Sequence, residues 1–203
     1  MTNLFIVDRR APQSSRMLDF IAIRGLRGMA AEQGEMILEI ALRARSAAGD
    51  SPISTLTLVA HGAPGALQMG LGLNEHTAHD FSPLRSRMRG GPLSSVRCFA
   101  CTAAANAGAD KWNKDGTLES GWGTTGSRTS ITTGRGYRLL MALARALGCE
   151  ARGPVLTQYL SAEGYQRMLD GEAFRGPVLV VAPDGGFRIE HPDGSVRDGA
   201  SYA

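Results

Sequence analysis

Short apolar runs alternate with amphipathic segments along this chain. The runs at 4–7, 53–60 and 96–101 have the length and the β-branched or aromatic content of buried strands. Residues 35–47 and 135–147 instead carry apolar side chains at the spacing of one helix face, and a glycine follows shortly after each segment. Strands that alternate with helices predict an α/β fold with a mostly parallel central sheet flanked by helices.

The end of the chain follows a different pattern. Two apolar runs, at 177–182 and 186–191, are separated by an Asp-Gly turn signal, which predicts a β-hairpin. We expect a single domain over the whole chain, with a core at about 1–160 and this hairpin as a C-terminal extension at about 175–203.

The remaining segments give fewer assignments of secondary structure. A short strand is expected at 66–70, a helix within 79–89 and a strand at 154–157. Residues 11–32 have apolar positions broken by glycines and allow no assignment. Residues 106–136 are rich in Gly, Thr and Ser, and a loop of that length is commonly functional or disordered.

Composition narrows the class of protein. The chain has 203 residues, of which 43% are hydrophobic and 20% charged, as in an ordinary globular protein. The net charge is +3, and no basic stripe is interleaved with aromatic residues, so we expect no nucleic-acid partner. No apolar stretch approaches the roughly 20 residues that span a bilayer, so we expect no membrane partner. The oligomeric state stays open.

The cysteines and the N-terminus predict the compartment. Three cysteines, an odd number, argue against a disulfide framework and fit a reducing environment. The first apolar run meets charge after four residues, which is too short for a secretory signal. We therefore expect a cytoplasmic protein, and export by a signal-independent route stays open.

The candidate chemistry lies at the ends of two predicted strands. One strand ends in His61-Gly62, and another ends in Cys101. In an open sheet of parallel strands, reactive groups gather beyond the carboxyl ends of the strands. A thiol becomes a nucleophile when a base favours its ionised form, and His61 can serve as that base. Backbone N–H groups of Gly62 and Cys101 can stabilise an oxyanion.

Each of these residues also has a structural interpretation. Free cysteines are among the most buried residues, so Cys98 and Cys101 can both belong to the core. Cys98 and Cys101 can also form a redox pair or half of a zinc site, for which His76 and His79 are the candidate partners. On a strand, positions 98 and 101 face opposite sides, which disfavours shared ligation. We predict that Cys98 is a core residue, that the two histidines are solvated, and that no metal is bound.

These elements resemble the caspase-like, or clan CD, cysteine peptidases. An apolar strand ends in His61-Gly62, and the next strand of this kind ends 40 positions later in Cys101 after an alanine. The stretch 58–70 is similar to bacterial members with a His-Gly-x-x-Gly turn, and residues 136–148 resemble the helix that follows their cysteine. The resemblance covers about half of the chain and implies a three-layer caspase-like sandwich.

The resemblance also implies roles for single residues. Cys101 would attack the peptide bond, His61 would move protons, and the N–H of Gly62 would stabilise the oxyanion. Asp8 ends the first strand, a position from which some relatives contact a basic substrate side chain; the alternative is an exposed turn aspartate. The implied partner is a peptide or protein substrate, and no cofactor is implied.

The chain departs from the family at two positions. Phe99 stands where metacaspases have an aspartate, and Thr102 follows the cysteine where caspases have a Gly-rich signature. The size and the C-terminal hairpin resemble the self-cleaving protease domains of bacterial toxins, which would make the protein an effector. A caspase-fold module that binds or regulates a partner without catalysis is the alternative function.

Overall fold

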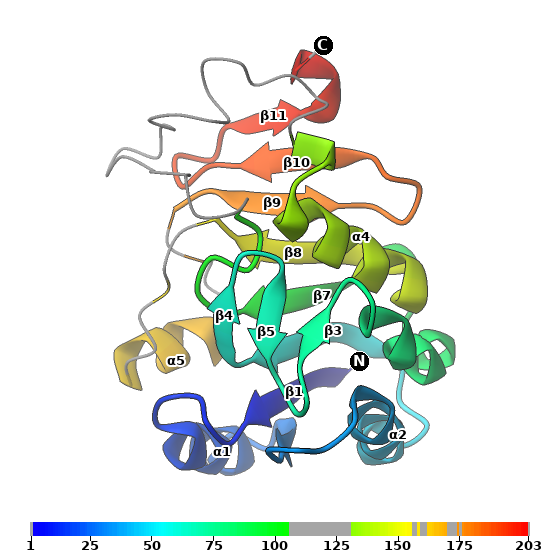
Figure 1. Ribbon diagram of the computed structural model, residues 1–203. Coiled ribbons are helices and arrows are strands. Elements are labelled where there is room, and N and C mark those ends of the chain that lie inside the picture. Colours follow the sequence, from blue (N-terminus) through cyan, green and yellow to red (C-terminus); the bar gives the residue numbers. More distant parts are fainter. Residues whose placement is uncertain are drawn as a thin grey trace.

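Most of the chain is arranged around one large β-sheet. The computed structural model describes residues 2–105, 131–155, 158, 162–169, 174 and 176–202. The strands of the large sheet are β1 (Thr2–Asp8), β2 (Arg27–Ala31), β3 (Ile53–Val59), β7 (Gly91–Phe99), β8 (Cys149–Pro154), β9 (Val178–Val181), β10 (Phe187–Glu190) and β11 (Val196–Asp198). Their order in the sheet is β11-β10-β9-β8-β7-β3-β1-β2 (Figure 1).

Helices and a small second sheet surround this large sheet. The helices are α1 (Ser14–Ile23), α2 (Ile37–Ala48), α4 (Arg135–Leu147) and α5 (Ala162–Leu169), and the 3-10 helices are η1 (Ala78–Arg87) and η2 (Gly199–Tyr202). The small sheet contains β4 (His61–Ala63), β5 (Ala66–Gln68) and β6 (Leu73–Asn74). In the part of the chain that the structure describes, no helix is long and apolar enough to cross a membrane.

The large sheet is mostly parallel. The neighbours β2, β1, β3, β7 and β8 all pair in parallel, so their carboxyl ends lie at one edge. The pairs β8–β9, β9–β10 and β10–β11 are antiparallel. The hairpin predicted near the C-terminus is confirmed as β9–β10, and it continues the large sheet beside β8.

Two apolar clusters lie on opposite faces of the sheet. In β1, Leu4 and Ile6 belong to the cluster that also contains buried residues of α2, η1 and α4. Phe5 and Val7 belong to the second cluster, together with residues of α1 and α5. Because both faces are buried, β1 is apolar without alternation. In Figure 1, α4 and the β4–β5 hairpin lie in front of the large sheet. The predicted α/β class, with helices flanking the sheet, is confirmed.

The predicted helices agree with the structure to differing degrees. Residues 135–147 form α4 with the predicted bounds, and the segment predicted at 35–47 forms α2. The helix predicted within 79–89 is the 3-10 helix η1, and it contains Pro83, which has no N–H for an α-helical bond. The unassigned segment 11–32 contains α1 and β2. Residues 106–130 of the predicted loop lie outside the described residues.

Of the strand predicted at 154–157, Pro154 ends β8, Val155 lies after it, and residues 156–157 lie outside the described residues. The strand β8 runs from Cys149 to Pro154 and contains Glu150 and Arg152, which do not look like residues of a buried strand. Tertiary structure explains their presence. Glu150 accepts two hydrogen bonds from Arg188 on β10, at 2.6 and 2.9 Å, and Arg152 pairs with Glu190 at 3.1 Å. These ion pairs across the sheet compensate the two charges, so the strand tolerates them.

Candidate active site

The structure places the two predicted strand ends side by side. The strands β3 and β7 are parallel neighbours, and Val59 lies opposite Phe99 in their register. The N–H of Ala60 donates to the carbonyl of Phe99 at 3.4 Å. His61 and Cys101 therefore follow adjacent strands at the same edge of the sheet, where parallel α/β folds place their chemistry.

Gly62 packs directly against the backbone of Cys101. A Cβ atom at Gly62 would lie 2.3 Å from the carbonyl oxygen of Cys101 and 2.9 Å from its nitrogen, and 2.8 Å from the Cβ of Ala100. Real Cβ atoms do not approach other atoms so closely, so only glycine permits this contact. The contact joins the strand that carries the histidine to the turn that carries the thiol.

The N–H of Gly62 points away from its own hairpin. Gly62 lies opposite Leu67, one position before the pair Ala63–Ala66, which closes a two-residue turn. The closing pair of such a turn is hydrogen-bonded, and successive pairs in an antiparallel ladder alternate. Gly62 is therefore in a non-hydrogen-bonded pair, and its N–H is not used by β5.

The turn after Cys101 is held in an uncommon conformation. Thr102 has φ 50°, in the left-handed region, which costs a residue with a side chain about 1 kcal/mol. The carbonyl of Ala103 accepts the N–H of Gly65 at 3.1 Å. The N–H of Ala104 donates to a carbonyl at the end of β8 at 3.0 Å. Contacts from two neighbouring segments thus fix the backbone that follows the thiol.

The start of α4 packs against the same turn. A Cβ at Gly136 would lie 2.2 Å from the carbonyl carbon and oxygen of Ala104. At Gly153 of β8, a Cβ would lie 3.2 Å from the Cβ of Ala104. Glycines on three elements (Gly62, Gly136 and Gly153) therefore let the surrounding backbone approach this turn.

The three thiols differ in their surroundings. Cys98 is fully buried, as predicted for a core residue, and burial raises the pKa of its thiol to about 12. Burial also raises the pKa of Cys149 to about 11. Cys101 is only partly buried, and its Sγ donates to the carbonyl of Gln158 at 3.2 Å. Access to reagents therefore separates Cys101 from the other two thiols.

We predict that a thiol reagent such as iodoacetamide labels Cys101 well before Cys98 or Cys149. At about pH 8, a thiol with a pKa of about 12 is ionised in roughly one molecule in ten thousand, and burial also blocks access. Peptide mass mapping of a time course measures the three rates in one sample. Labelling of Cys98 or Cys149 as fast as Cys101 in the folded protein would contradict the prediction.

The histidines differ in where they lie relative to the candidate site. His61 is exposed at the start of β4, next to the Gly62–Cys101 contact. His76 and His79 were predicted to be solvated, and their side chains are 83% and 77% exposed. Within the described residues, no group of three or more His, Cys, Asp or Glu side chains is placed to hold a metal ion.

Asp8 is buried, so the alternative of an exposed turn aspartate is wrong. Its carboxylate accepts hydrogen bonds from the backbone and guanidinium of Arg10 and from the N–H of Gly70, at 2.8–3.0 Å. Burial alone would raise the pKa of Asp8, but these hydrogen bonds outweigh it and hold the pKa below its ordinary value. Its predicted contact with a substrate stays a prediction.

Sequence reasoning missed the residues that hold the site together. Arg10, Gly65 and Gly136 each contact a segment of the site, and no contact was predicted for them from the sequence, although Gly65 ends the His-Gly-x-x-Gly turn. Arg10 is two positions after Asp8, and an Asp-x-Arg pattern was the available signal. The turn motif contains Gly65, but the partners of both glycines come from distant parts of the chain, so the sequence does not show these contacts.

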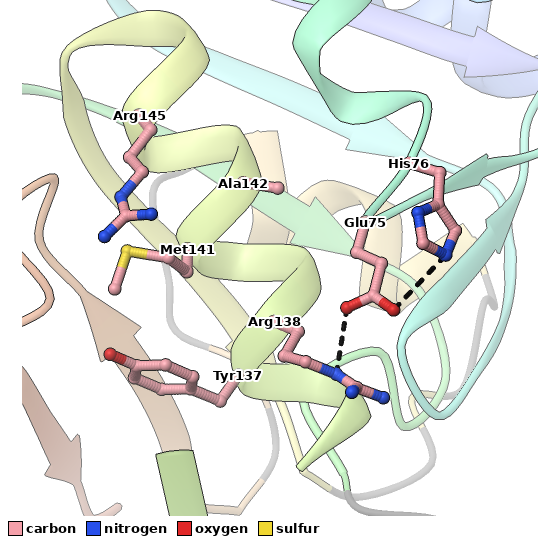
Figure 2. Close-up of a pocket in the computed structure, with 7 residues that line it drawn as sticks. All are labelled: Glu75, His76, Tyr137, Arg138, Met141, Ala142 and Arg145. Atoms are coloured by element: carbon pink, nitrogen blue, oxygen red, sulfur yellow. Dashed lines mark ion pairs between the residues drawn. The ribbon is translucent and has the colours of Figure 1, made fainter. Parts of the chain in front are cut away.

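A concave surface with a volume of about 380 Å³ lies along α4, away from the strand ends (Figure 2). Its lining residues are Glu75, His76, Tyr137, Arg138, Met141, Ala142 and Arg145. Glu75 pairs with Arg138 at 2.9 Å and with His76 at 3.4 Å. The hydroxyl of Tyr137 donates to the carbonyl of Gly185 at 2.9 Å. Its acidic and phenolic groups already have protein partners, so we place the candidate chemistry at the strand ends.

The chain was compared with known proteins. No family model matches it, and neither the curated proteins nor the solved structures contain a match. The residues at the strand ends and their geometry are therefore the basis for a function.

Proposed function

We propose that this chain is a cysteine endopeptidase of the caspase-like type. The observation that carries the proposal is the contact of Gly62 with the backbone of Cys101 at the ends of two parallel neighbours. It brings a histidine, a partly exposed thiol and an N–H that β5 does not use to one edge of the sheet. This combination supplies a base, a nucleophile and an oxyanion donor, which acyl transfer requires.

The proposed reaction has two halves. His61 takes the proton of the Cys101 thiol, and the sulfur forms a bond to the scissile carbonyl carbon. The carbon–nitrogen bond then breaks as His61 returns the proton to the leaving amine. Water adds to the resulting thioester with its proton passing to His61, and the acid product leaves as the thiol is restored.

Two backbone donors support this reaction. The N–H groups of Gly62 and Cys101 would stabilise the negative charge on the carbonyl oxygen in the tetrahedral intermediate. Both belong to backbone that is held by the close contact between the hairpin and the turn. For attack to occur, the thiol has to leave the carbonyl of Gln158, to which it donates in this structure.

The Gln158 contact is also the observation that favours the alternative function. A thiol whose hydrogen bond goes to a backbone carbonyl, at 3.2 Å, is in a resting arrangement. A caspase-fold module that binds a partner without catalysis would keep this arrangement permanently. The two functions therefore differ in whether Cys101 ever reacts.

A digest of a peptide library tests the proposal. We expect the wild-type protein to cut peptides at a consistent set of sites, and we expect the Cys101→Ala variant to cut none. Mass spectrometry of the products also reports the preferred side chain. The matched control is Cys149→Ala, the same change at a buried thiol, which should leave the cleavage pattern unchanged. Cleavage that survives in Cys101→Ala, or no cleavage by either protein, would contradict the proposal.

A further inference from the structure

Asp8 and Arg10 connect the end of β1 to the hairpin that carries His61. Arg10 donates through its Nε to one carboxylate oxygen of Asp8 and through its Nη2 to the other, both at 2.8 Å. The carboxylate is fully buried, so this two-point pair has little competition from water. Its geometry fixes where the guanidinium lies.

The same guanidinium reaches the far strand of the hairpin. One hydrogen of Nη2 is directed to Asp8, and the second is shared between the carbonyls of Gly70, at 2.8 Å, and Gln68, at 3.1 Å. Asp8 adds a direct contact, because its carboxylate accepts the N–H of Gly70 at 3.0 Å. One shared hydrogen bond from Arg10 and one direct hydrogen bond from Gly70 to Asp8 therefore tie the end of β1 to the segment 68–70.

Gln68 is the residue that lies opposite His61 in the hairpin. The pair is hydrogen-bonded, since it lies two positions from the closing pair of the turn. A contact that holds the backbone of Gln68 therefore also holds the backbone of His61, and through Gly62 it holds the hairpin against Cys101.

We infer that Asp8 and Arg10 are positioning residues, which set the place of His61 through the backbone of Gln68. This role rests on the proposed function only in taking His61 as the proton carrier; the mechanical link is independent of catalysis. It also gives Asp8 a use other than contact with a substrate, because its carboxylate is buried and both of its oxygens accept protein donors.

The substitutions Asp8→Asn and Arg10→Lys test this link. Asn keeps the shape of the carboxyl group and loses its charge. Lys keeps the charge that pairs with Asp8 but loses the planar fork that reaches two carbonyls at once. Because Arg10→Lys leaves the buried carboxylate with a cation, it keeps the test valid if Asp8→Asn does not fold. The matched control is Arg9→Lys, the same change one position earlier, where the arginine pairs with Glu32 in an exposed position.

The decisive measurement is amide hydrogen exchange followed by NMR on the full chain. We expect the amides of His61 and Gln68 to exchange about tenfold faster or more in both test variants, because the hairpin opens locally. The amides of Val180 and Arg188, which pair on β9 and β10, should not change. In Arg9→Lys, the exchange rates of all four amides should equal those of the wild type.

Peptide cleavage is the second measurement. We expect kcat to fall about tenfold or more in both test variants, with KM within about twofold of the wild type, since base placement and not substrate binding is affected. If Cys101 proves inert in the library digest, the proposed function fails, and the exchange data still decide whether the link exists.

Two results would overturn the inference. Equal acceleration at both amide pairs would mean that Asp8 and Arg10 stabilise the whole fold without a special effect on the hairpin. Unchanged exchange at His61 and Gln68, with a raised KM for peptides that have a basic side chain before the scissile bond, would mean that Asp8 binds substrate.

Discussion

Replacing Cys101 with alanine is expected to lower kcat/KM for peptide cleavage by about 10⁴-fold or more. Removing a nucleophile removes the covalent route, and the remaining groups act only on water, as in other enzymes that use a nucleophile and a base. The alanine side chain fits a partly exposed position, so we expect the free energy of unfolding to change by less than about 1 kcal/mol. Steady-state kinetics and urea unfolding measure the two quantities.

His61→Ala is measured in the same way as Cys101→Ala. We expect a loss of about 10²- to 10⁴-fold, because a general base in that position contributes an effect of this size. The double variant Cys101→Ala, His61→Ala should be no slower than Cys101→Ala alone, since the two residues act as a unit. His76→Ala is the control, because His76 is exposed on the concave surface along α4 and has no role in the proposed reaction. Additive losses in the double variant would separate His61 from the reaction of Cys101.

Replacing Gly62 with alanine is expected to damage both stability and activity. The new methyl group would lie 2.3 Å from the carbonyl oxygen of Cys101, so the hairpin or the turn has to move. Overpacking of this kind costs about 1–3 kcal/mol of unfolding free energy. The movement would also withdraw the N–H of Gly62 from the oxyanion, and loss of one such donor costs about 10²-fold or more in kcat.

A second glycine provides the control for Gly62. At Gly186, a Cβ would meet only the exposed side chain of Asp184, at 3.2 Å, and the backbone there is not left-handed. Gly186→Ala should therefore stay within about 0.5 kcal/mol and keep full activity. Chemical denaturation and peptide kinetics on both variants give the comparison. Full activity in Gly62→Ala would show that the contact with Cys101 has no part in catalysis.

Local patterns in the sequence predicted much of the fold. The run 53–60 became β3, and the helical spacing of residues 135–147 became α4, because an apolar period of two or of 3.6 already determines which face can be buried. The hairpin β9–β10 followed from its Asp-Gly turn. The strand β8 was missed because its buried positions are short residues that alternate with Glu150 and Arg152, which are half-buried and pair with residues of β10.

The sequence by itself indicated which residues follow β3 and β7, and so which side chains are candidates for chemistry. Only the tertiary structure decided that these ends are neighbours, because strand order depends on pairing between segments that are far apart in the chain. It also showed that Asp8 is buried, with Arg10 and Gly70 as its hydrogen-bond donors. Close contacts such as Gly62 against Cys101 require that distant segments are placed to within a few tenths of an ångström, and a one-dimensional pattern does not contain this information.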